Sequence, residues 1–400
     1  MSAYVLAPGR EKSLLHRHPW VFSGAIEKAK GEVGAGDTVD IVAADGRFLA
    51  RAAASPASQI RARVWTFDPD QKVDAAFLDA RLRAAIARRA PLFDASHNAA
   101  RLVHAESDGL PGLIVDRYGD LLVVQVLSAG IEAWRGAIVE SLLAITGAAA
   151  IFERSDAEVR SLENLPPRSG ALNRSDASNP QAPGAATILE HGLTYRVDAA
   201  TGQKTGFFLD QRENRQRIRE FATGCEVLDC FCYTGGFALN ALSAGASSVL
   251  AIDSSADAIR TAEENARANR LDLSRAHFLE ADAFKHLRLL RDQGRSFDLI
   301  VLDPPKLAPT IRHVERAARA YKDINLLALK LLRRGGILAT FSCSGGVGIE
   351  LFQKIVAGAA VDARVDAQIV ERLGPSSDHP VSLAFPEGDY LKGLLLRRMS

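Results

Sequence analysis

Cysteine, long apolar runs and an excess of either charge are all scarce in this 400-residue sequence. Four cysteines are too few for a disulfide framework, so we expect reduced thiols. No apolar run reaches the roughly 18 to 20 residues of a membrane helix, and the first residues lack the charged-then-apolar order of a secretory signal. We therefore expect a cytoplasmic protein. The 49 basic and 48 acidic side chains leave a net charge of +1, so nucleic-acid binding would need a local basic patch.

The sequence contains enough apolar residues to form a hydrophobic core in each domain, since 47% of its residues are hydrophobic. At typical domain sizes, this length predicts two or three domains. The stretch 165–184 concentrates Pro, Ser, Gly and Asn without periodicity, which indicates a long loop and a domain boundary. We therefore divide the chain into residues 1–72, 73–184 and 185–400.

Residues 1–72 alternate short β-like runs with glycine turns, which predicts a small, mostly β domain such as a compact barrel. Its basic residues Arg51, Arg61 and Arg63, together with aromatic side chains such as Trp20 and Phe22, could form an RNA-binding surface. Taken alone, these residues are equally consistent with solvated strand faces.

Residues 73–184 have the pattern of an α+β domain. Over 74–90, apolar residues recur every three or four positions, as in an amphipathic helix. A hairpin that turns at 118–120, a helix over 133–145 and a strand over 148–154 are expected to follow. This segment contains no evident chemical motif.

Residues 185–400 contain apolar runs of four to six residues, each followed by a helical pattern, which predicts an α/β fold with a doubly wound, mostly parallel sheet. The expected strands are 226–231, 248–253, 276–281, 298–303 and 336–342. The expected helices are 236–245, 256–270, 283–294, 324–334 and 349–361. Two further strand-like stretches, 367–373 and 390–399, could close the sheet as an antiparallel hairpin.

Ligands of open α/β sheets bind beyond the carboxyl ends of the strands. The turn from Asp229 to Phe237 carries two glycines and leads into a helix, so a ligand can approach its backbone closely. It lacks the G-x-G-x-x-G and phosphate-loop patterns, which disfavours dinucleotides and triphosphates. Asp253 could accept both hydroxyls of a ribose and Asp282 an exocyclic amine, although a single acid after a strand often only caps the next helix.

Two further strand ends bring an acid and a thiol towards one cleft. Asp303 is followed by two prolines and Lys306, and the prolines fix the backbone there. Cys343 lies among serines and glycines that leave its sulfur accessible, which favours a reactive thiol over the small buried side chain that an isolated cysteine usually is. Cys230 and Cys232 have no matching His or Cys pair, so no zinc site is predicted.

These motifs resemble a known family. The turn DCFCYTGGF, Asp253, DPPK and SCS are similar to the signature of class I S-adenosylmethionine-dependent methyltransferases. HPWVFSGAI, TGQKTGFFLDQRENR, YKDINLLALKLL, TFSCSGG, DHP and PEGDYLKG resemble the bacterial ribosomal RNA large subunit methyltransferase I family over nearly the whole chain. The resemblance implies an N-terminal PUA domain, an α+β middle domain and a C-terminal Rossmann-like domain that uses S-adenosyl-L-methionine to methylate carbon 5 of one cytosine in 23S rRNA.

The resemblance also implies residue roles. The expected cofactor contacts are Phe231, Cys232, Tyr233, Thr234, Gly235, Gly236, Phe237, Asp253, Asp282 and Asp303. The expected RNA contacts are Lys306, Arg51, Arg61, Arg63 and Lys204. The segment 201–215 is expected to form a turn, a short strand and a helix beside cofactor and RNA, although its charges alone suggest a solvated helix face. Phe207 and Phe208 could stack on a flipped base or pack in the core.

Carbon 5 of cytosine is a poor nucleophile, so its methylation needs a thiolate that adds to carbon 6. Cys343 is the candidate nucleophile. Asp303 could bind the ring nitrogen and exocyclic amine of the base, or only order its own turn. Lys306 could contact phosphate, favour the thiolate or be solvated. The residue that removes the proton from carbon 5 is left unassigned.

Three other functions stay open at this point. A methyltransferase acting on a base nitrogen would leave Cys343 without a covalent task. A non-enzymatic RNA-binding protein could keep the fold for structure alone, and a Rossmann-type oxidoreductase is weakened by the missing phosphate fingerprint. The expected partner is 23S rRNA or a precursor of the large ribosomal subunit, with no membrane and no metal, and a homodimer is compatible with the sequence.

Overall fold

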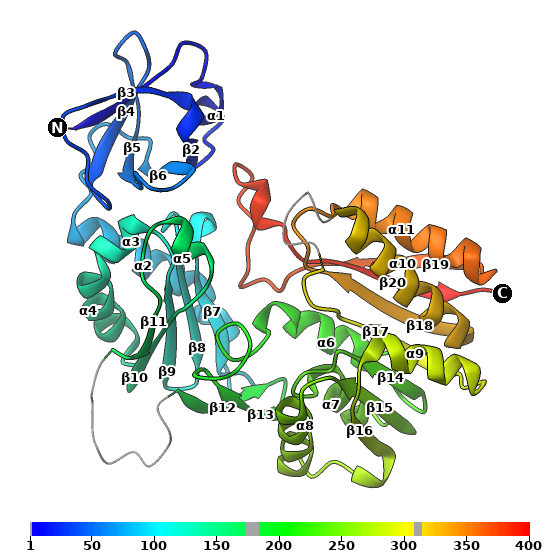
Figure 1. Ribbon diagram of the computed structural model, residues 1–400. Helices are drawn as coiled ribbons and strands as arrows, with labels where there is room; N and C mark the ends of the chain where they lie inside the picture. The colour runs from blue at the N-terminus through cyan, green and yellow to red at the C-terminus, as the bar shows by residue number, and fades with distance from the viewer. Residues whose placement is uncertain (1, 173–183, 308–313) are drawn as a thin grey trace. The chain divides into compact units, whose positions relative to one another are not determined.

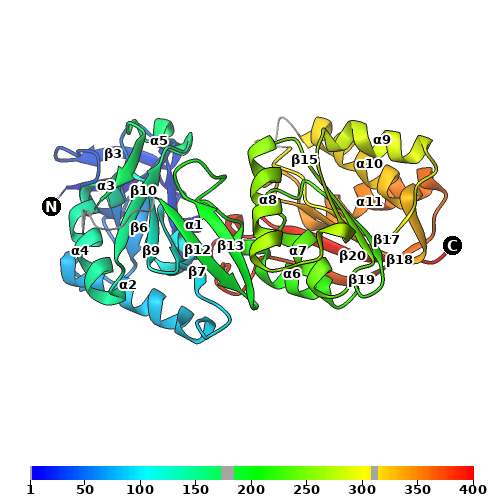
Figure 2. The same cartoon turned by 90° about the horizontal axis from the view of Figure 1, so that it is seen from below.

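The computed structural model describes residues 2–172, 184–307 and 314–400. The chain forms two compact units, shown in Figures 1 and 2. The first unit contains residues 1–190, 196–209 and 378–388, and the second unit contains residues 191–195, 210–377 and 389–400. The domain limits at residues 72 and 184 stay predictions.

The first unit begins with a six-stranded sheet of order β2-β6-β5-β4-β1-β3. Its strands are β1 (Ala3–Leu6), β2 (Trp20–Phe22), β3 (Ile26–Lys30), β4 (Thr38–Val42), β5 (Phe48–Ala54) and β6 (Ile60–Thr66). Val39 and Ile41 alternate along β4 and are fully buried, so they pack in a core with Leu14 of α1 (Lys12–Leu15). The mostly β character predicted for this segment is confirmed.

A second sheet of the first unit has the order β11-β10-β9-β8-β7. Its strands are β7 (Ala99–His104), β8 (Leu113–Tyr118), β9 (Leu121–Val126), β10 (Ala150–Ser155) and β11 (Arg168–Ala171). Its helices are α2 (Ala75–Arg89), α3 (Ala129–Ala133), α4 (Arg135–Thr146) and α5 (Val159–Leu162). The predicted helix and hairpin are confirmed, since α2 buries Leu78 and Leu82 and the antiparallel strands β8 and β9 turn at Gly119 and Asp120.

The prediction of a loop over residues 165–184 is wrong for the first part of this range. Residues 168–171 form β11, which pairs antiparallel with β10. Composition gave no sign of this pairing, because the edge of β10 supplies backbone partners whatever the side chains of β11 are. Residues 173–183 of the predicted loop lie outside the described residues. Next, β12 (Ala185–Glu190) and β13 (Leu193–Asp198) form a two-stranded sheet.

The second unit is built on a seven-stranded sheet of order β16-β15-β14-β17-β18-β20-β19. Its strands are β14 (Glu226–Cys230), β15 (Ser248–Asp253), β16 (Ala276–Glu280), β17 (Phe297–Leu302), β18 (Leu332–Ser342), β19 (Ala367–Leu373) and β20 (Lys392–Arg398). The first five are parallel. Strand β20 is antiparallel to β18 and β19. The predicted doubly wound sheet with an antiparallel end hairpin is confirmed.

Helices cover both faces of this sheet, as Figure 1 shows. The helices are α6 (Arg212–Arg219), α7 (Gly236–Ser243), α8 (Ala256–Ala268), α9 (Ala283–Asp292), α10 (Val314–Leu331) and α11 (Ile349–Ala363). The first three share one hydrophobic core, which includes Phe237, and the last three share another, which includes Phe352. Strands buried on both faces read as continuous apolar runs, which is why the sequence revealed them.

Two elements of the second half differ from their predictions. The helix expected over 324–334 starts at Val314, and its last residues instead open β18, where Leu332 pairs with Phe297. In 201–215 no strand forms, and the chain passes through turns into α6. Arg212 and Arg215 of α6 are buried, so the expectation of a solvated helix face is wrong for these two arginines.

Candidate active site

The carboxyl ends of five parallel strands meet at one edge of the sheet in the second unit. The winding reverses between β14 and β17, where a ligand crevice is expected. Backbone hydrogen bonds fix the loops at this edge. Cys232 N donates to Ile252 O at 3.0 Å, and Ala281 N donates to Asp253 O at 2.8 Å.

The turn after β14 has an unusual backbone. Phe231 and Tyr233 have φ angles of 65° and 49°, in a left-handed region that costs a side-chain-bearing residue about 1–3 kcal/mol. Gly235 has φ 85°, and a Cβ atom there would lie 2.6 Å from Leu239 Cδ1, so both backbone conformation and space favour glycine. Tyr233 N donates to Asp253 Oδ2 at 2.9 Å. The turn is therefore a fixed, bare cradle before α7.

Three residues predicted to contact a cofactor are packed in the core. Cys232 and Phe237 are buried, and the Phe237 ring stacks on Phe341 with 5.7 Å between centroids. Gly236 lies against Arg215 of α6, whose Cδ would be 2.9 Å from an added Cβ. Contact through the side chains of Cys232 and Phe237 is therefore disfavoured, and their backbone atoms are what they can present to a ligand.

Two other predicted contacts also have structural tasks. Thr234 is buried, and its carbonyl accepts from Asn265 Nδ2 at 3.1 Å. Its hydroxyl has no hydrogen-bond partner among the described residues, so a ligand could satisfy it. Asp282 is exposed and caps α9 by accepting from Lys285 N at 3.0 Å, the structural role that a single acid after a strand often has.

Two partly exposed carboxylates, Asp253 and Asp303, concentrate negative charge at this edge, and Asp229 lies buried beside them. Asp229 is fully buried and accepts from Ala238 N at 2.9 Å through Oδ2. Burial raises the pKa of Asp229 well above its usual value, and the charges of Asp303 and Asp253 raise it further. The negative field favours a cationic ligand and disfavours phosphate. The site thus fits S-adenosylmethionine, which combines a sulfonium cation with a ribose that Asp253 is placed to bind.

Cys343 follows β18, the neighbour of the strand that ends before Asp303. Cys343 is partly exposed, whereas Cys230 and Cys232 are buried. Burial raises the pKa of both buried thiols well above the usual value, so they are unreactive at neutral pH. Asp303 is half-buried, and Lys306 is exposed after the two prolines. The structure thus brings the predicted acid, thiol and lysine to the same sheet edge.

Buried polar groups hold the loop that carries Cys343. The Tyr321 hydroxyl of α10 bonds with the hydroxyls of Ser342 and Ser344, each at 3.0 Å. Lys392 of β20 lies opposite Ser342 in the strand ladder. Its Nζ donates to the carbonyls of Ser344 at 3.0 Å and Tyr390 at 2.7 Å. The loop is therefore tied to a helix and to a neighbouring strand.

Lys392 is a residue that the sequence reasoning missed. It is 5% exposed and forms no ion pair with a described residue. Burial lowers the pKa of Lys392. Negative charge on Asp389 and on Cys343 raises this pKa, and the positive charge of Lys306 lowers it, so these three residues lie close to Lys392. A cation beside a thiol stabilises the thiolate. The available signal was a lysine inside the otherwise apolar stretch 390–396.

The structure disfavours the predicted RNA contact for two of the three arginines of the first unit. Arg63 is buried and pairs with Glu163 at 2.7 Å. Arg51 is buried and pairs with Asp40 at 2.8 Å. A buried guanidinium needs such a partner, so both charges are engaged by carboxylates within the unit. Arg61 is half-buried and remains a proposed RNA contact.

Three other residues singled out by the sequence lie in the first unit. Lys204 is exposed, and its Nζ lies 4.5 Å from the centroid of the Phe208 ring. Phe207 is buried, which leaves it a packing role, while Phe208 is half-buried. Lys204, Arg51, Arg61 and Arg63 therefore belong to a different unit from Cys343 and the cofactor turn.

Two kinds of feature are missing from the part of the chain that the structure describes. None of its helices combines the length and apolarity that crossing a membrane requires. It also contains no group of three or more His, Cys, Asp or Glu side chains arranged to hold a metal ion.

Comparisons with known proteins agree with this geometry. Residues 177–397 match a family model described as S-adenosylmethionine-dependent methyltransferase, and residues 5–67 match one described as PUA-like domain. The ribosomal RNA large subunit methyltransferase I of Cronobacter sakazakii is 50% identical over 395 residues, which are 97% of each chain. That of Shewanella denitrificans is 51% identical over 394 residues, which are 98% of each chain.

Solved structures share the fold at lower identity. A Streptococcus mutans protein described as a SAM-dependent methyltransferase is 20% identical and has a TM-score of 0.84. The match covers 99% of this chain and 100% of that protein. A second structure with a TM-score of 0.85 and 20% identity was solved in complex with SAH. With half of its residues identical to the two relatives over nearly their full length, the chain belongs to the ribosomal RNA large subunit methyltransferase I family and uses S-adenosyl-L-methionine.

Proposed function

We propose that the protein transfers a methyl group from S-adenosyl-L-methionine to carbon 5 of one cytosine in 23S rRNA, through a covalent adduct with Cys343. The names of its relatives support ribosomal RNA of the large subunit as the substrate. The partly exposed Cys343 at the sheet edge that holds the cofactor turn is the observation that carries the choice of carbon 5. Transfer to a base nitrogen has no use for a thiol there.

In the proposed reaction, the Cys343 thiolate adds to carbon 6 of the cytosine and makes carbon 5 enamine-like. S-Adenosylmethionine supplies a methyl group that carbon 5 can attack. The new bond is from carbon 5 to the methyl carbon, and the electron pair of the broken bond stays on the donor sulfur. Removal of the proton from carbon 5 then expels the thiolate from carbon 6 and restores the aromatic ring.

We assign supporting roles to the neighbouring residues. Asp303, held before two prolines, is placed to bind the exocyclic amine of the base and, when protonated, its ring nitrogen. Lys306 is exposed and suits an RNA phosphate. Asp253 suits the ribose hydroxyls of the cofactor, Asp282 its adenine amine, and the backbone from Phe231 to Phe237 its remaining parts.

Replacing single cysteines tests this proposal. Cys343→Ala should lower methyl transfer to a 23S rRNA transcript by more than about 100-fold, because the covalent step is lost. Cys225→Ala is a matched control, since Cys225 is also partly exposed but precedes β14 at the opposite edge of the sheet. It should keep activity within about twofold. Both variants should bind S-adenosylmethionine equally well in calorimetry.

The atom that receives the methyl group provides a second readout. Mass spectrometry of RNA fragments should locate the new group on a cytosine, at carbon 5. RNA that carries 5-fluorocytosine at that position should form a stable adduct with the unmodified protein and none with the C343A variant, since fluorine cannot leave as a proton does. Full transfer by the C343A variant, or methylation of a base nitrogen, would contradict the proposal.

A further inference from the structure

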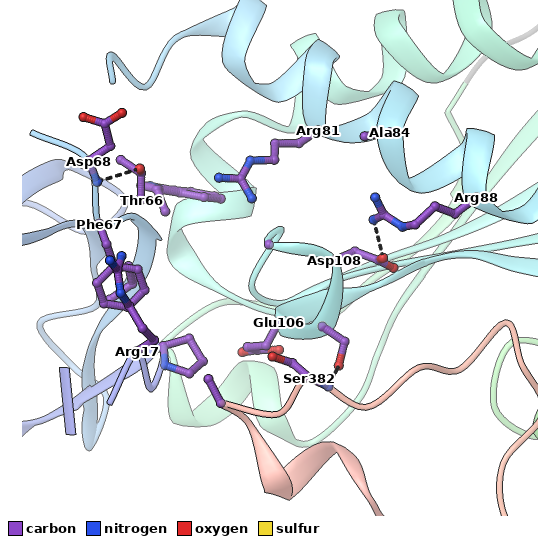
Figure 3. A pocket seen from close by; sticks show the side chains of 16 residues that line it. Arg17, Thr66, Phe67, Asp68, Arg81, Ala84, Arg88, Glu106, Asp108 and Ser382 are labelled. Carbon is purple, nitrogen blue, oxygen red and sulfur yellow. Dashed lines mark hydrogen bonds and ion pairs between the residues drawn. The ribbon is translucent and has the colours of Figure 1, made fainter. Parts of the chain in front are cut away.

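A cavity of about 620 Å³ opens in the first unit (Figure 3). Residues 64–68 at the end of β6 form one part of its lining. Arg81, Ala84 and Arg88 of α2 form a second part, and residues 106–109 form a third. Ser382 and Ala384 come from the segment 378–388, which the first unit includes. Arg17 and Pro19 add a fifth part, so five separate parts of the chain build this cavity.

Two arginines at the cavity carry charge without a carboxylate partner among the described residues. Figure 3 shows the Arg81 guanidinium group projecting from α2 into the space. Its central carbon lies 4.9 Å from the centroid of the Phe77 ring. Arg17 is exposed, and its guanidinium carbon lies 4.8 Å from the centroid of the Phe67 ring. Burial lowers the pKa of Arg81, and nearby Arg88 lowers it further, so an anion here would stabilise its charge.

The carboxylates that line the cavity leave Arg81 and Arg17 uncompensated. Glu106 accepts a hydrogen bond from Trp20 Nε1 at 2.8 Å. Asp108 accepts from two guanidinium nitrogens of Arg89, each at 2.8 Å. Asp68 is exposed, and its Oδ1 accepts from the backbone of Asp70. Each of the three acids thus already accepts a hydrogen bond from a donor of the protein.

A neutral donor and a strained backbone add to the charges. Trp65 lines the cavity, is 3% exposed, and its Nε1 has no hydrogen-bond partner among the described residues. A buried unpaired donor is costly and suits an acceptor-rich ligand. Arg17 has φ 63°, a conformation that is rare for a residue with a side chain and is found more often at binding sites.

Arg81 also lines a neighbouring hollow of about 500 Å³. That hollow contains Lys72 and shares Phe77 with the surroundings of the first cavity. The acid in it, Asp74, already caps α2 by accepting from Phe77 N at 2.9 Å. The two hollows therefore form a basic and aromatic path along α2, with Arg81 common to both. Such a path matches the alternation of phosphates and bases in a single strand.

We propose that the cavity around Arg81 binds a phosphate-bearing nucleotide of single-stranded RNA, with the strand continuing into the hollow beside Lys72. This inference rests on the proposed function for its ligand, because RNA is the substrate proposed above. Arg81 and Arg17 bind phosphate, Phe67 offers a face for stacking, and Trp65 Nε1 donates to an oxygen or ring nitrogen of the nucleotide. The site contributes to RNA binding and has no part in methyl transfer.

Binding of a fluorescein-labelled single-stranded RNA of about 12 nucleotides to the full chain tests the site. Arg81→Gln should weaken binding about tenfold and reduce the slope of log K against log salt by about 0.7, as expected for one lost phosphate contact. Arg83→Gln is the control, because Arg83 is on the same helix, is exposed and pairs with Asp79, but does not line the cavity. It should leave affinity and slope unchanged. Arg81→Lys should keep the slope, and melting temperatures establish that each variant is folded.

Two further readouts separate this inference from the proposed chemistry. In methyl transfer to 23S rRNA, the R81Q variant should raise KM about tenfold and leave kcat unchanged, whereas the C343A variant loses kcat. RNA that carries 4-thiouridine should crosslink on irradiation to peptides containing Trp65 or Phe67. Equal binding by the R81Q variant and the unmodified protein, equal weakening by R81Q and R83Q, or crosslinks only to other peptides would each overturn the site while the Cys343 chemistry stands.

Discussion

At the scale of single residues, Lys392 shows how one buried charge can serve a reactive group. The side chain is almost fully removed from water, and among the described residues its hydrogen bonds go to two backbone carbonyls, those of Ser344 and Tyr390. A lysine held in this way costs stability in its charged form. This cost is offset if the positive charge stabilises a nearby thiolate. Cys343 is close enough to influence the pKa of Lys392, so its thiol is the candidate.

Lys392→Met should therefore slow methyl transfer about 10- to 100-fold at neutral pH, because the Cys343 thiolate loses its neighbouring cation. Alkylation of Cys343 by iodoacetamide, measured against pH in the absence of RNA, should shift to higher pH in the K392M variant. Lys392→Arg keeps the charge and should restore the profile. Lys354→Met removes an exposed lysine of α11 and serves as the control. An alkylation profile that does not move would contradict this role.

The K392M substitution should also change how the free energy of unfolding depends on pH in the alkaline range. Burial lowers the pKa of Lys392 from its usual 10.5 in the folded protein. Between the lowered pKa and 10.5, the unfolded chain binds more protons than the folded chain, so this residue makes the free energy of unfolding rise with pH. The K392M variant lacks that contribution, which urea titrations at several pH values would measure.

At the scale of elements, the turn between β14 and α7 combines a ligand cradle with close packing. Gly235 has φ 85°, and an added Cβ would lie 2.6 Å from Leu239 Cδ1 and 3.1 Å from Ala262 Cβ. Gly224 precedes the same strand with φ 73° and has no atom within 4 Å of an added Cβ. The two glycines thus share a backbone conformation and differ in the space around them.

Gly235→Ala should lower the free energy of unfolding by about 2–4 kcal/mol, since strain and overpacking add. It should also weaken S-adenosylmethionine binding by more than about tenfold, because the turn must move. Gly224→Ala should cost about 1–2 kcal/mol from strain alone and leave the affinity unchanged. Calorimetry of binding and of thermal unfolding would measure both effects. Similar affinities for the two variants would show that the tight packing at Gly235 is not needed to shape the turn.

Element types could be predicted where burial imposes a pattern. The central strands β14 and β17 are mostly buried between the two helix layers, and α2 places its apolar residues at helical spacing, so both were visible in the sequence. Strand β11 was not visible, because an edge pairing depends on backbone groups more than on side chains. The burial of Arg63 and Arg212 was also hidden, since a charge in a sequence does not reveal its distant partner.

At the scale of the whole molecule, the chain passes between the two units after residues 190, 195, 209, 377 and 388. The segment 378–388 leaves the second unit between β19 and β20 and packs in the first. Asp378 Oδ2 accepts from Arg101 N at 2.8 Å, and the Asp378 carbonyl accepts from Arg89 at 3.1 Å. No periodicity or motif marks such a return, so the sequence reasoning treated 185–400 as one continuous domain.

This path predicts that residues 185–400 alone do not reproduce the properties of the full chain. In the full chain, Asp378, His379 and Phe385 are buried in the first unit, and the isolated fragment would expose them together with the ends of β20 and β19 that the segment connects. Exposure of a buried aspartate and a large apolar ring favours local unfolding of the segment. Because Lys392 begins β20 only a few residues later, that unfolding should reach the Cys343 loop.

The fragment 185–400 should therefore unfold several degrees lower than the full chain, and its Cys343 should react faster with iodoacetamide because the loop is less protected. A full-length Asp378→Asn variant keeps the first unit and weakens only the docking of the segment 378–388, so it separates the effect of the segment from the effect of removing the first unit. Its amide still accepts from Arg101 N but lacks the charge, so it should show a smaller change in the same direction. Hydrogen exchange of β20 in both proteins would measure the effect locally. Identical exchange in the fragment and the full chain would show that the second unit is stable without the docking of this segment.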